Sequence, residues 1–462
     1  MEKIMKKIVA GRIPGFSRFL LVTALGFAGP GHAHAEDLLD IFNLAADNDP
    51  QIRQARAEFN ATHTNVAQGR SQLLPSVTVT ANTGRLAQGP GVDGFIPAYS
   101  YANGFNSKGY GLSISQNLLN FEAWYSYQSI LIADQAAATS LARSEQELIL
   151  RVSNAYFDVL RSQDNLATFQ AELEASARIL EQAQERYDVG LVPITDVYDS
   201  RASYDLARVN LLVEENTLNQ RYEALEAITG EDHNDVASLD DSFPIESLTP
   251  DSMEDWVSIA DNSNLDIIAA RQTLASREYE ADAARAAMFP TLDLSAGYNW
   301  NESGGISFFN LTPGAADAIS INSNITLNLS IPLFQGGLNR ARVRQALYNV
   351  NASEESLLRT ERTSTQDIRN NYRNVENDVL TIAARQQAVL SAQSQLEATE
   401  AGQEAGTRNI VDVVTAQRLL FQAMRDLANA RYNYVINTLN LKQAAGLLSP
   451  QDVIDLNEWL VE

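Results

Sequence analysis

The stretch NITLNLSIPLFQGG, Asn324–Gly337, alternates apolar and polar side chains. Ile325, Leu327 and Leu329 are apolar, and the residues between them are Thr and Asn. This period of two predicts a β-strand with one apolar face. The sequence that follows, from about 338 to 403, is helix-forming but has too few large apolar side chains to cover a sheet. The apolar face of the strand therefore needs another environment.

Residues 1–35 have the features of a secretory signal peptide. They contain five Lys or Arg residues, an apolar run at 19–28, and Ala33-His34-Ala35, which predicts cleavage after Ala35. The apolar run is about ten residues, half of what a membrane-spanning helix needs. Removal of residues 1–35 changes the net charge from −24 to −28, because five cations and one acid are lost. Such acidity argues against nucleic-acid binding.

The chain contains no cysteine. An exported fold of this sequence must therefore be held by packing, and it cannot carry a lipid on an N-terminal cysteine. Only His63 and His233 follow the predicted cleavage site, and no phosphate-binding loop, GxSxG or HExxH motif occurs. We therefore expect no metal and no other cofactor, and we do not expect an enzyme.

The sequence repeats itself at a spacing of 215 to 216 residues. LLPSVTVTAN from Leu73 aligns with MFPTLDLSAG from Met288, and VGLVPITDV from Val189 aligns with AGTRNIVDV from Ala405. Each repeat is expected to contain a helix, two strands, a long helix, a tight turn and a second helix. The predicted divisions are a first repeat over 36–230, a link over 231–252, a second repeat over 253–446 and a C-terminal segment over 447–462.

The two long helices are predicted by an apolar residue at every seventh position, which is typical of coiled-coil packing. These positions are Val152, Val159, Leu166, Leu173 and Leu180 in the first repeat, and Ile368, Val375, Ile382, Val389 and Leu396 in the second. Helices over about 121–187 and 338–403 would each be roughly 100 Å long at 1.5 Å per residue. An ordinary helical bundle explains the heptads alone, but not this length together with the attached strands.

Four strands are predicted, each with one apolar and one polar face, as in a transmembrane β-barrel. They are Pro75–Arg85, Gly109–Leu118, Pro290–Trp300 and Ile319–Leu333. Aromatic residues cluster near the strand ends, as at a membrane interface: Phe95, Tyr99, Tyr101, Phe105 and Tyr110 in one pair, and Tyr298, Trp300, Phe308 and Phe309 in the other. A small soluble sandwich is the alternative, but it is disfavoured by the number of strands.

Four strands cannot close a barrel, and open strand edges are not viable in lipid. Several chains must therefore share one barrel. Two chains would give eight strands with a nearly filled interior, whereas three would give twelve and leave room for a pore. We expect an α+β membrane protein that is a homotrimer, with a 12-stranded transmembrane barrel continuous with a long α-helical coiled-coil barrel.

These features together resemble the TolC family of outer-membrane efflux channels. The likeness is carried by LLPSVTV, FPTLDLSAG, ERYDVGLVPITDV, AGTRNIVDVV and LANARYNYVINTLNLKQAAG, and it extends from residue 36 to about 456. The resemblance implies an outer-membrane location in contact with lipid, with the helices extending into the periplasm. It also implies that segments 231–252 and 447–462 belong to an equatorial belt.

In function, the resemblance implies a passive exit duct of a tripartite efflux pump or a type I secretion system. Drugs, other small molecules or proteins would pass through it. A periplasmic adaptor and an inner-membrane pump of the RND, ABC or MFS type would be its partners. Drug efflux and protein secretion both stay open, because the pump selects the substrate.

The resemblance further implies roles for residues near the two helical turns. Arg408 would bond Thr195 and Asp196, and this latch would hold the periplasmic tip closed until the helices untwist. Asp412 would form a ring of carboxylates that narrows the pore and favours cations. The adaptor would dock on Val189, Gly190, Leu191, Gly406 and Thr407. At two supporting positions of the family, a tyrosine and a second aspartate, this chain has Gln403 and Thr415.

The main alternative from another class is an exported coiled-coil scaffold without a pore. The alternating strands with aromatic ends argue against it. A periplasmic enzyme is the third candidate, and the missing motifs disfavour it.

Overall fold

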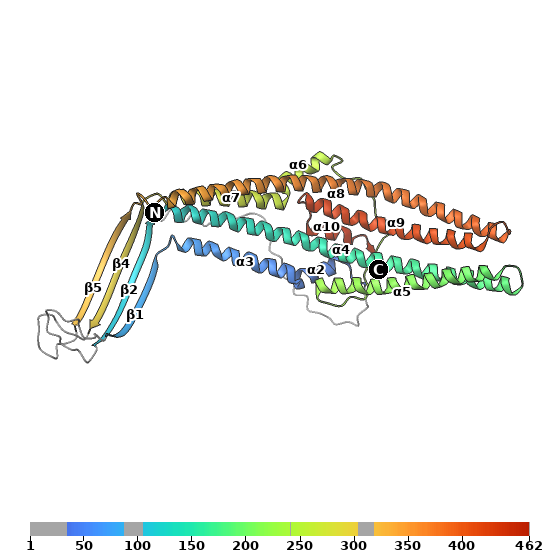
Figure 1. The fold of residues 1–462 in the computed structure, drawn as a ribbon, viewed down its shortest axis with the longest axis horizontal. Helices are drawn as coiled ribbons and strands as arrows, with labels where there is room; N and C mark the ends of the chain where they lie inside the picture. Colours follow the sequence, from blue (N-terminus) through green and yellow to red (C-terminus); the bar gives the residue numbers. More distant parts are fainter. Residues whose placement is uncertain (1–34, 87–104, 241, 304–317, 462) are drawn as a thin grey trace. The chain divides into compact units, whose positions relative to one another are not determined.

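A computed structural model describes residues 35–86, 105–240, 242–303 and 318–461. The described chain is mostly helical and contains one four-stranded antiparallel sheet (Figure 1). The predicted signal peptide lies outside the described residues, apart from Ala35. So do five of the predicted interfacial aromatics, namely Phe95, Tyr99, Tyr101, Phe308 and Phe309.

The two halves of the chain contain the same order of elements. The first half has α2 (Leu38–Asn48), α3 (Pro50–Ser71), β1 (Ser76–Leu86), β2 (Phe105–Leu119), α4 (Phe121–Asp188) and α5 (Ile194–Thr229). The second half has α6 (Met253–Ser263), α7 (Leu265–Ala286), β4 (Thr291–Ser303), β5 (Ala318–Ser330), α8 (Leu338–Glu404) and α9 (Ile410–Ala444). Three short elements complete the chain: β3 (Ser238–Leu239), α10 (Pro450–Asn457) and β6 (Leu460–Val461).

The predicted strands and long helices are confirmed within a few residues. Each long helix begins at the predicted residue and ends one residue beyond the predicted limit. β2 begins four residues earlier than predicted. The prediction was wrong at the end of β5, which stops at Ser330 rather than Leu333. Pro332 explains the early end, because proline has no amide hydrogen to donate to a strand ladder.

The heptad positions pack the long helices against their neighbours. Val152 and Val159 of α4 are buried, as are Ile368 and Val375 of α8. Ile382 is buried as well, whereas the heptad residues still nearer the turns are half-buried. α4 packs against α3 and α7 along one part of its length and against α5 and α9 along the other, whereas α8 packs against α7 and α9. Among the described residues, no helix is both long enough and apolar enough to cross a membrane.

Each long helix also has a tyrosine four residues after its first heptad position, Val152 or Ile368, and each tyrosine anchors a distant segment. The Tyr156 hydroxyl donates to the Ala237 carbonyl at 2.6 Å. The Tyr372 hydroxyl donates to the Asp251 carbonyl at 3.2 Å. Burial raises the pKa of Tyr156 far above its ordinary value, and Asp37 adds to this. These bonds fix the 231–252 segment to the helices, where β3 pairs with β6.

The sheet has the strand order β1-β2-β4-β5, and all its pairs are antiparallel. Its register sorts the side chains by face. One face carries Val77, Ile114, Ala296 and Ile325 in a single row across the four strands. The row beside it on the other face is Thr78, Ser113, Gly297 and Asn324. In Figure 1 the sheet extends beyond the ends of the helices, and among the described residues no helix covers its apolar face.

Small residues make the polar face narrower than the apolar face. Gly109 lies between Asn82 and Asn301, and a Cβ added there would be 2.4 Å from the Asn301 Oδ1. A Cβ at Gly111 would be 2.5 Å from the Asn299 Oδ1. The asparagine side chains thus occupy the space above the glycines. Crowding by Ile, Leu, Tyr and Trp on the opposite face favours curvature with the polar face inside.

The end of α9 supplies a test of this packing. Gly446 has a φ of +73°, and a Cβ there would lie 2.0 Å from the Ser263 carbonyl oxygen. We expect Gly446→Ala to lower the free energy of unfolding by about 1–2 kcal/mol from left-handed strain and about 1–3 kcal/mol more from the clash. Urea unfolding followed by circular dichroism in detergent measures the loss.

Gly336→Ala is the matched control, because Gly336 has a φ of +62° and open space around it. We expect only the strain component there. Equal losses in the two variants would show that α9 does not pack tightly against the α6–α7 junction.

Candidate functional site

Both helical hairpins end in the same tight turn, at the end of the helices farthest from the sheet (Figure 1). After α4, the Leu191 amide donates to the Arg186 carbonyl at 2.8 Å. After α8, the Thr407 amide donates to the Gly402 carbonyl at 2.8 Å. Each turn requires a left-handed residue, which is Gly190 or Gly406, with φ of +76° and +74°. This arrangement is the Schellman motif, which satisfies the last carbonyls of a helix.

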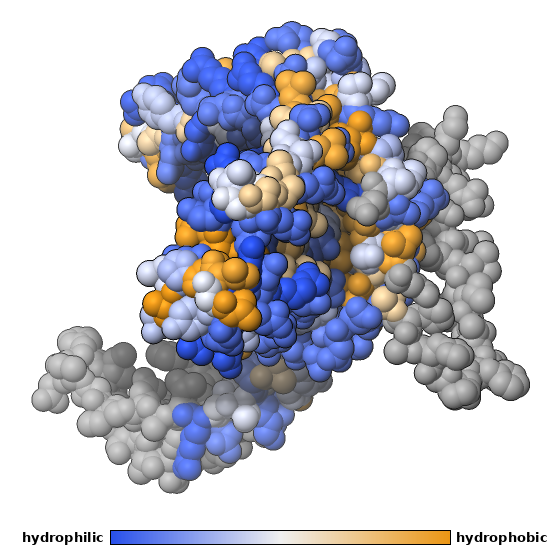
Figure 2. Space-filling view, turned by 90° about the vertical axis from the view of Figure 1, so that its right-hand side faces the viewer, coloured by the Kyte–Doolittle hydropathy of each residue, from blue (hydrophilic) through white to orange (hydrophobic). Residues whose placement is uncertain are grey.

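The residues predicted to dock an adaptor all lie in these turns. Val189 and Leu191 are 70% and 71% exposed. A Cβ at Gly190 or Gly406 would meet nothing within 4 Å. Figure 2 looks at this end of the molecule and shows separate apolar patches among hydrophilic side chains. The turn after α4 therefore presents two aliphatic side chains, and the backbone is uncovered at the glycine of each turn.

Arg408, the predicted latch cation, lies just beyond the α8 turn. Its Nη1 is 3.9 Å from the Asp412 Oδ2, one helical turn further along the chain. Asp412 also caps α9, because its amide donates to the Asn409 side chain at 2.9 Å and its carboxylate accepts from the Asn409 amide. A Cβ at Gly402 would lie 2.8 Å from the Arg408 Cγ, so this glycine leaves room for the arginine stem.

The other two latch residues lie at the start of α5. The Thr195 hydroxyl donates to the Asp196 carboxylate at 3.4 Å. Asp196 also lines a small crevice with Gln403 and Ile410, so the two turns are neighbours. Among the described residues of one chain, Arg408 forms no ion pair with Asp196. The three residues are gathered at one end of the helices, and their mutual bond stays a prediction.

A polar connection between α4 and α9 was not foreseen from the sequence. Glu172 of α4 forms a 2.8 Å ion pair with Arg425 of α9, and the two side chains are only 9% and 17% exposed. The Arg425 guanidinium also lies 4.2 Å from the centre of the Phe169 ring. Nearer the sheet, the Tyr432 hydroxyl donates to Asp164 at 2.6 Å. Burial raises the pKa of Tyr432 well above its usual value, and the nearby negative charge of Asp164 raises this pKa further.

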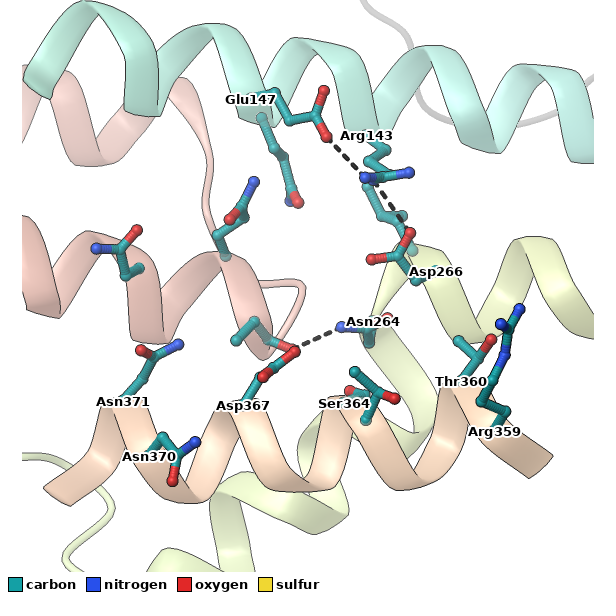
Figure 3. A pocket seen from close by; sticks show the side chains of 16 residues that line it. Arg143, Glu147, Asn264, Asp266, Arg359, Thr360, Ser364, Asp367, Asn370 and Asn371 are labelled. Atoms are coloured by element: carbon teal, nitrogen blue, oxygen red, sulfur yellow. Dashed lines mark hydrogen bonds and ion pairs between the residues drawn. The ribbon is translucent and has the colours of Figure 1, made fainter. Parts of the chain in front are cut away.

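A cavity of about 850 Å³ opens where the start of α7 meets the end of α9, between α4 and α8 (Figure 3). The Asn264 side chain donates to the Ala444 carbonyl at 2.7 Å. Arg143 forms ion pairs with Asp266 at 3.0 Å and with Glu147 at 2.9 Å. The lining is polar and carries both charges, which favours water as its occupant. The described residues include no group of three or more side chains that could hold a metal ion.

Aromatic pairs mark both ends of the sheet. Tyr110 and Trp300 stack at 4.6 Å on the apolar face, near the end far from the helices. Phe121 and Phe289 meet edge to face at 5.9 Å, where β2 and β4 join the helices. From Thr291, the first residue of β4, to Trp300 the strand rises about 31 Å at 3.4 Å per residue. A strand tilt of about 40° reduces this to roughly 24 Å, close to the height of a barrel's apolar band.

An apolar sheet face bounded by aromatic residues, joined to long helical hairpins, defines a channel-type protein of the outer membrane. The family model described as "Outer membrane efflux protein" matches residues 41–231 and 256–447. The chain belongs to this family, and it is therefore an outer-membrane efflux channel.

Individual relatives agree with this assignment. The outer membrane protein TolC of Vibrio cholerae is 37% identical over 428 residues, covering 92% of this chain and 94% of the relative. The alkaline protease secretion protein AprF of Pseudomonas aeruginosa is 27% identical, covering 91% and 86%. The solved structure of CusC matches the fold with a TM-score of 0.76 at 18% identity, covering 88% of this chain and 92% of that one.

The buried ion pair between α4 and α9 gives a testable expectation. Glu172→Gln leaves the Arg425 charge buried without its partner, and we expect it to cost about 3 kcal/mol of unfolding free energy. Glu174→Gln is the control, because the Glu174–Arg178 pair is 3.4 Å apart with both side chains at least 70% exposed, and we expect a change below about 0.5 kcal/mol. Thermal unfolding of both variants in detergent compares them. Similar losses would mean that the α4–α9 pair is solvated.

Proposed function

We propose that three copies of the chain assemble into one closed barrel of twelve strands. The observation that carries this proposal is the sheet, whose apolar face and two outer strand edges have no partner within the part of the chain that the structure describes. Within one chain, β1 and β5 each pair on a single side. An unpaired strand edge is costly in lipid because no water can satisfy it. Pairing β5 of one copy with β1 of the next removes every edge, and three sheets of four strands leave an open interior.

Exposed apolar side chains on the helices support a ring of identical copies. α5 carries Leu206, Val209, Leu212 and Val213, all more than half exposed. α8 carries Leu380 and Leu390, which are 66% and 59% exposed. At 1.5 Å per residue, the α5 group lies roughly 18–29 Å from the start of α5. The α8 pair lies roughly 21–36 Å from the end of α8, and both of these helix ends are at the turns. The two groups are at matching heights, so α5 of one copy can cover α8 of its neighbour in a head-to-tail ring.

The trimer would act as a passive exit duct for drugs, other small molecules or proteins. The helices would extend the duct into the periplasm and meet a periplasmic adaptor and an inner-membrane pump of the RND, ABC or MFS type. The exposed turns around Gly190 and Gly406 suit docking, because Val189 and Leu191 can be buried by a partner without any rearrangement. One kind of conduit could serve both protein secretion, as the name of the AprF relative describes, and efflux, as the family name describes, because the pump would select the substrate.

The resting duct would be closed at the turns by Arg408. In the ring, Arg408 would leave its weak contact with Asp412 and bond Thr195 and Asp196 instead. Asp412 would then face the axis, and three such carboxylates would form a negatively charged constriction. Opening would follow when the adaptor and pump separate the hairpins and the helices untwist. Gln403 and Thr415 leave the latch with less support and the constriction with one carboxylate per chain.

Single-channel recording in a planar bilayer tests this gate. We expect Arg408→Ala to raise the resting conductance several-fold, because the charge-assisted bond that holds the hairpins together is lost. The control is Arg178→Ala, which removes an exposed arginine of α4 that pairs within its own helix. Unchanged conductance in Arg408→Ala, beside a conducting wild type, would refute the latch.

The same recordings test the constriction, since the wild-type pore should prefer cations and Asp412→Asn should reduce that preference. An anion-selective wild-type pore would contradict the assignment of Asp412.

A further inference from the structure

The start of α8 is locally basic in an acidic protein. The chain has a net charge of −24, yet residues 338–353 include Arg340, Arg342 and Arg344 and no acidic residue. All three arginines are exposed. Among the described residues, none of the three forms an ion pair, whereas Arg271, Arg277, Arg285 and Arg385 elsewhere in the second half do so. Three exposed guanidinium groups without an ion pair in the described chain concentrate positive charge on one short stretch of helix, which an anion can bind.

Apolar side chains lie immediately beside this basic segment. Leu333 and Phe334, in the connection from β5 to α8, are 91% and 86% exposed, the highest values among the exposed large apolar residues. Leu338, the first residue of α8, is 47% exposed. A surface that combines aromatic or aliphatic residues with arginine is typical of a membrane–water interface.

We propose that Arg340, Arg342 and Arg344 bind anionic phospholipid headgroups of the membrane leaflet that faces the helices. This inference rests on the proposed placement of the sheet in the membrane and deepens it. Leu333 and Phe334 enter the edge of the hydrocarbon layer, and the guanidinium groups bind the phosphates directly outside it. The lipids thereby fix the depth at which the sheet ends and the helices begin.

The dimensions agree with this arrangement. At 1.5 Å per residue, Arg340, Arg342 and Arg344 lie roughly 3, 6 and 9 Å along α8 from its first residue. The headgroup layer of one leaflet is roughly 5–8 Å thick. Long arginine stems can bring all three charges into that layer. Arg340 and Arg344 share one face of the helix because they are four residues apart.

Charge complementarity selects lipid over a protein partner. α7, which packs against α8, carries Glu280 and Asp282 in its last turns, but these two carboxylates pair with Arg277 and Arg285 of the same helix. In the proposed ring, α3 of the neighbouring copy would lie beside α8, and its last turn adds Arg70 rather than an acid. The segment is also continuous with the apolar face of the sheet, whose proposed neighbour is the lipid itself.

Electron spin resonance with spin-labelled lipids tests the proposal. The full chain is reconstituted in phosphatidylcholine vesicles that contain a trace of spin-labelled phosphatidylglycerol or phosphatidylcholine. We expect the wild type to hold phosphatidylglycerol in preference, and Arg340→Gln/Arg344→Gln to reduce that preference by roughly threefold or more. Arg373→Gln is the control, because Arg373 is an exposed arginine further along α8, roughly 43 Å from Arg344 at 1.5 Å per residue. Salt at 1 M should abolish the wild-type preference.

The possible outcomes distinguish the headgroup site from the proposal on which it rests, that the sheet lies in the membrane. A wild type without preference, or a double variant equal to Arg373→Gln, would overturn the headgroup site. If motionally restricted lipid is still seen in that case, the sheet does lie in the membrane. The absence of restricted lipid around any variant would overturn both proposals.

Discussion

The structure depends on one constraint, which is that no helix among the described residues covers the apolar face of the β1-β2-β4-β5 sheet. A water-exposed sheet of this kind would be unstable, and a lipid-exposed one must have no open edges. The polar face is lined by Ser, Thr, Asn and Gly, so it suits a water-filled interior. Both requirements are met when several chains share a barrel. In the proposed assembly the long helices would continue the wall of that barrel, which would explain why they are far longer than a globular core requires.

The elements were largely predictable because their periods are strong. The alternation of apolar and polar residues predicted the four strands. The heptad spacing predicted α4 and α8, and the predicted ends of these helices differ from the observed ends by at most one residue. The end of β5 was missed because the apolar alternation continues through Leu333, although Pro332 has already ended the ladder. The roles of Tyr156 and Tyr372 were also missed. These tyrosines lie between the heptad positions, and only the fold shows that their hydroxyl groups bind carbonyls in the segment between the repeats.

The candidate site was predictable in its location but not in its contacts. The turn glycines Gly190 and Gly406 and the polar residues beyond them are placed together by the antiparallel hairpins. Within one chain Arg408 lies near Asp412 rather than Asp196, and heptad spacing carries no information on such contacts. The Glu172–Arg425 pair was overlooked for a related reason. Each residue is an ordinary surface charge in the sequence, and its burial arises only when α9 packs against α4.

Cross-linking between the two sheet edges tests the central claim most directly. The chain has no cysteine, so one cysteine can replace Thr80 in β1 and another can replace Ser320, Asn322 or Asn324 in β5. Within one chain these edges are about 14 Å apart, three strand spacings, which prevents an internal disulfide. The account predicts that at least one pairing gives covalently joined trimers in lipid vesicles, reversed by reductant. Membrane-inserted protein that forms no such species in any pairing would contradict it.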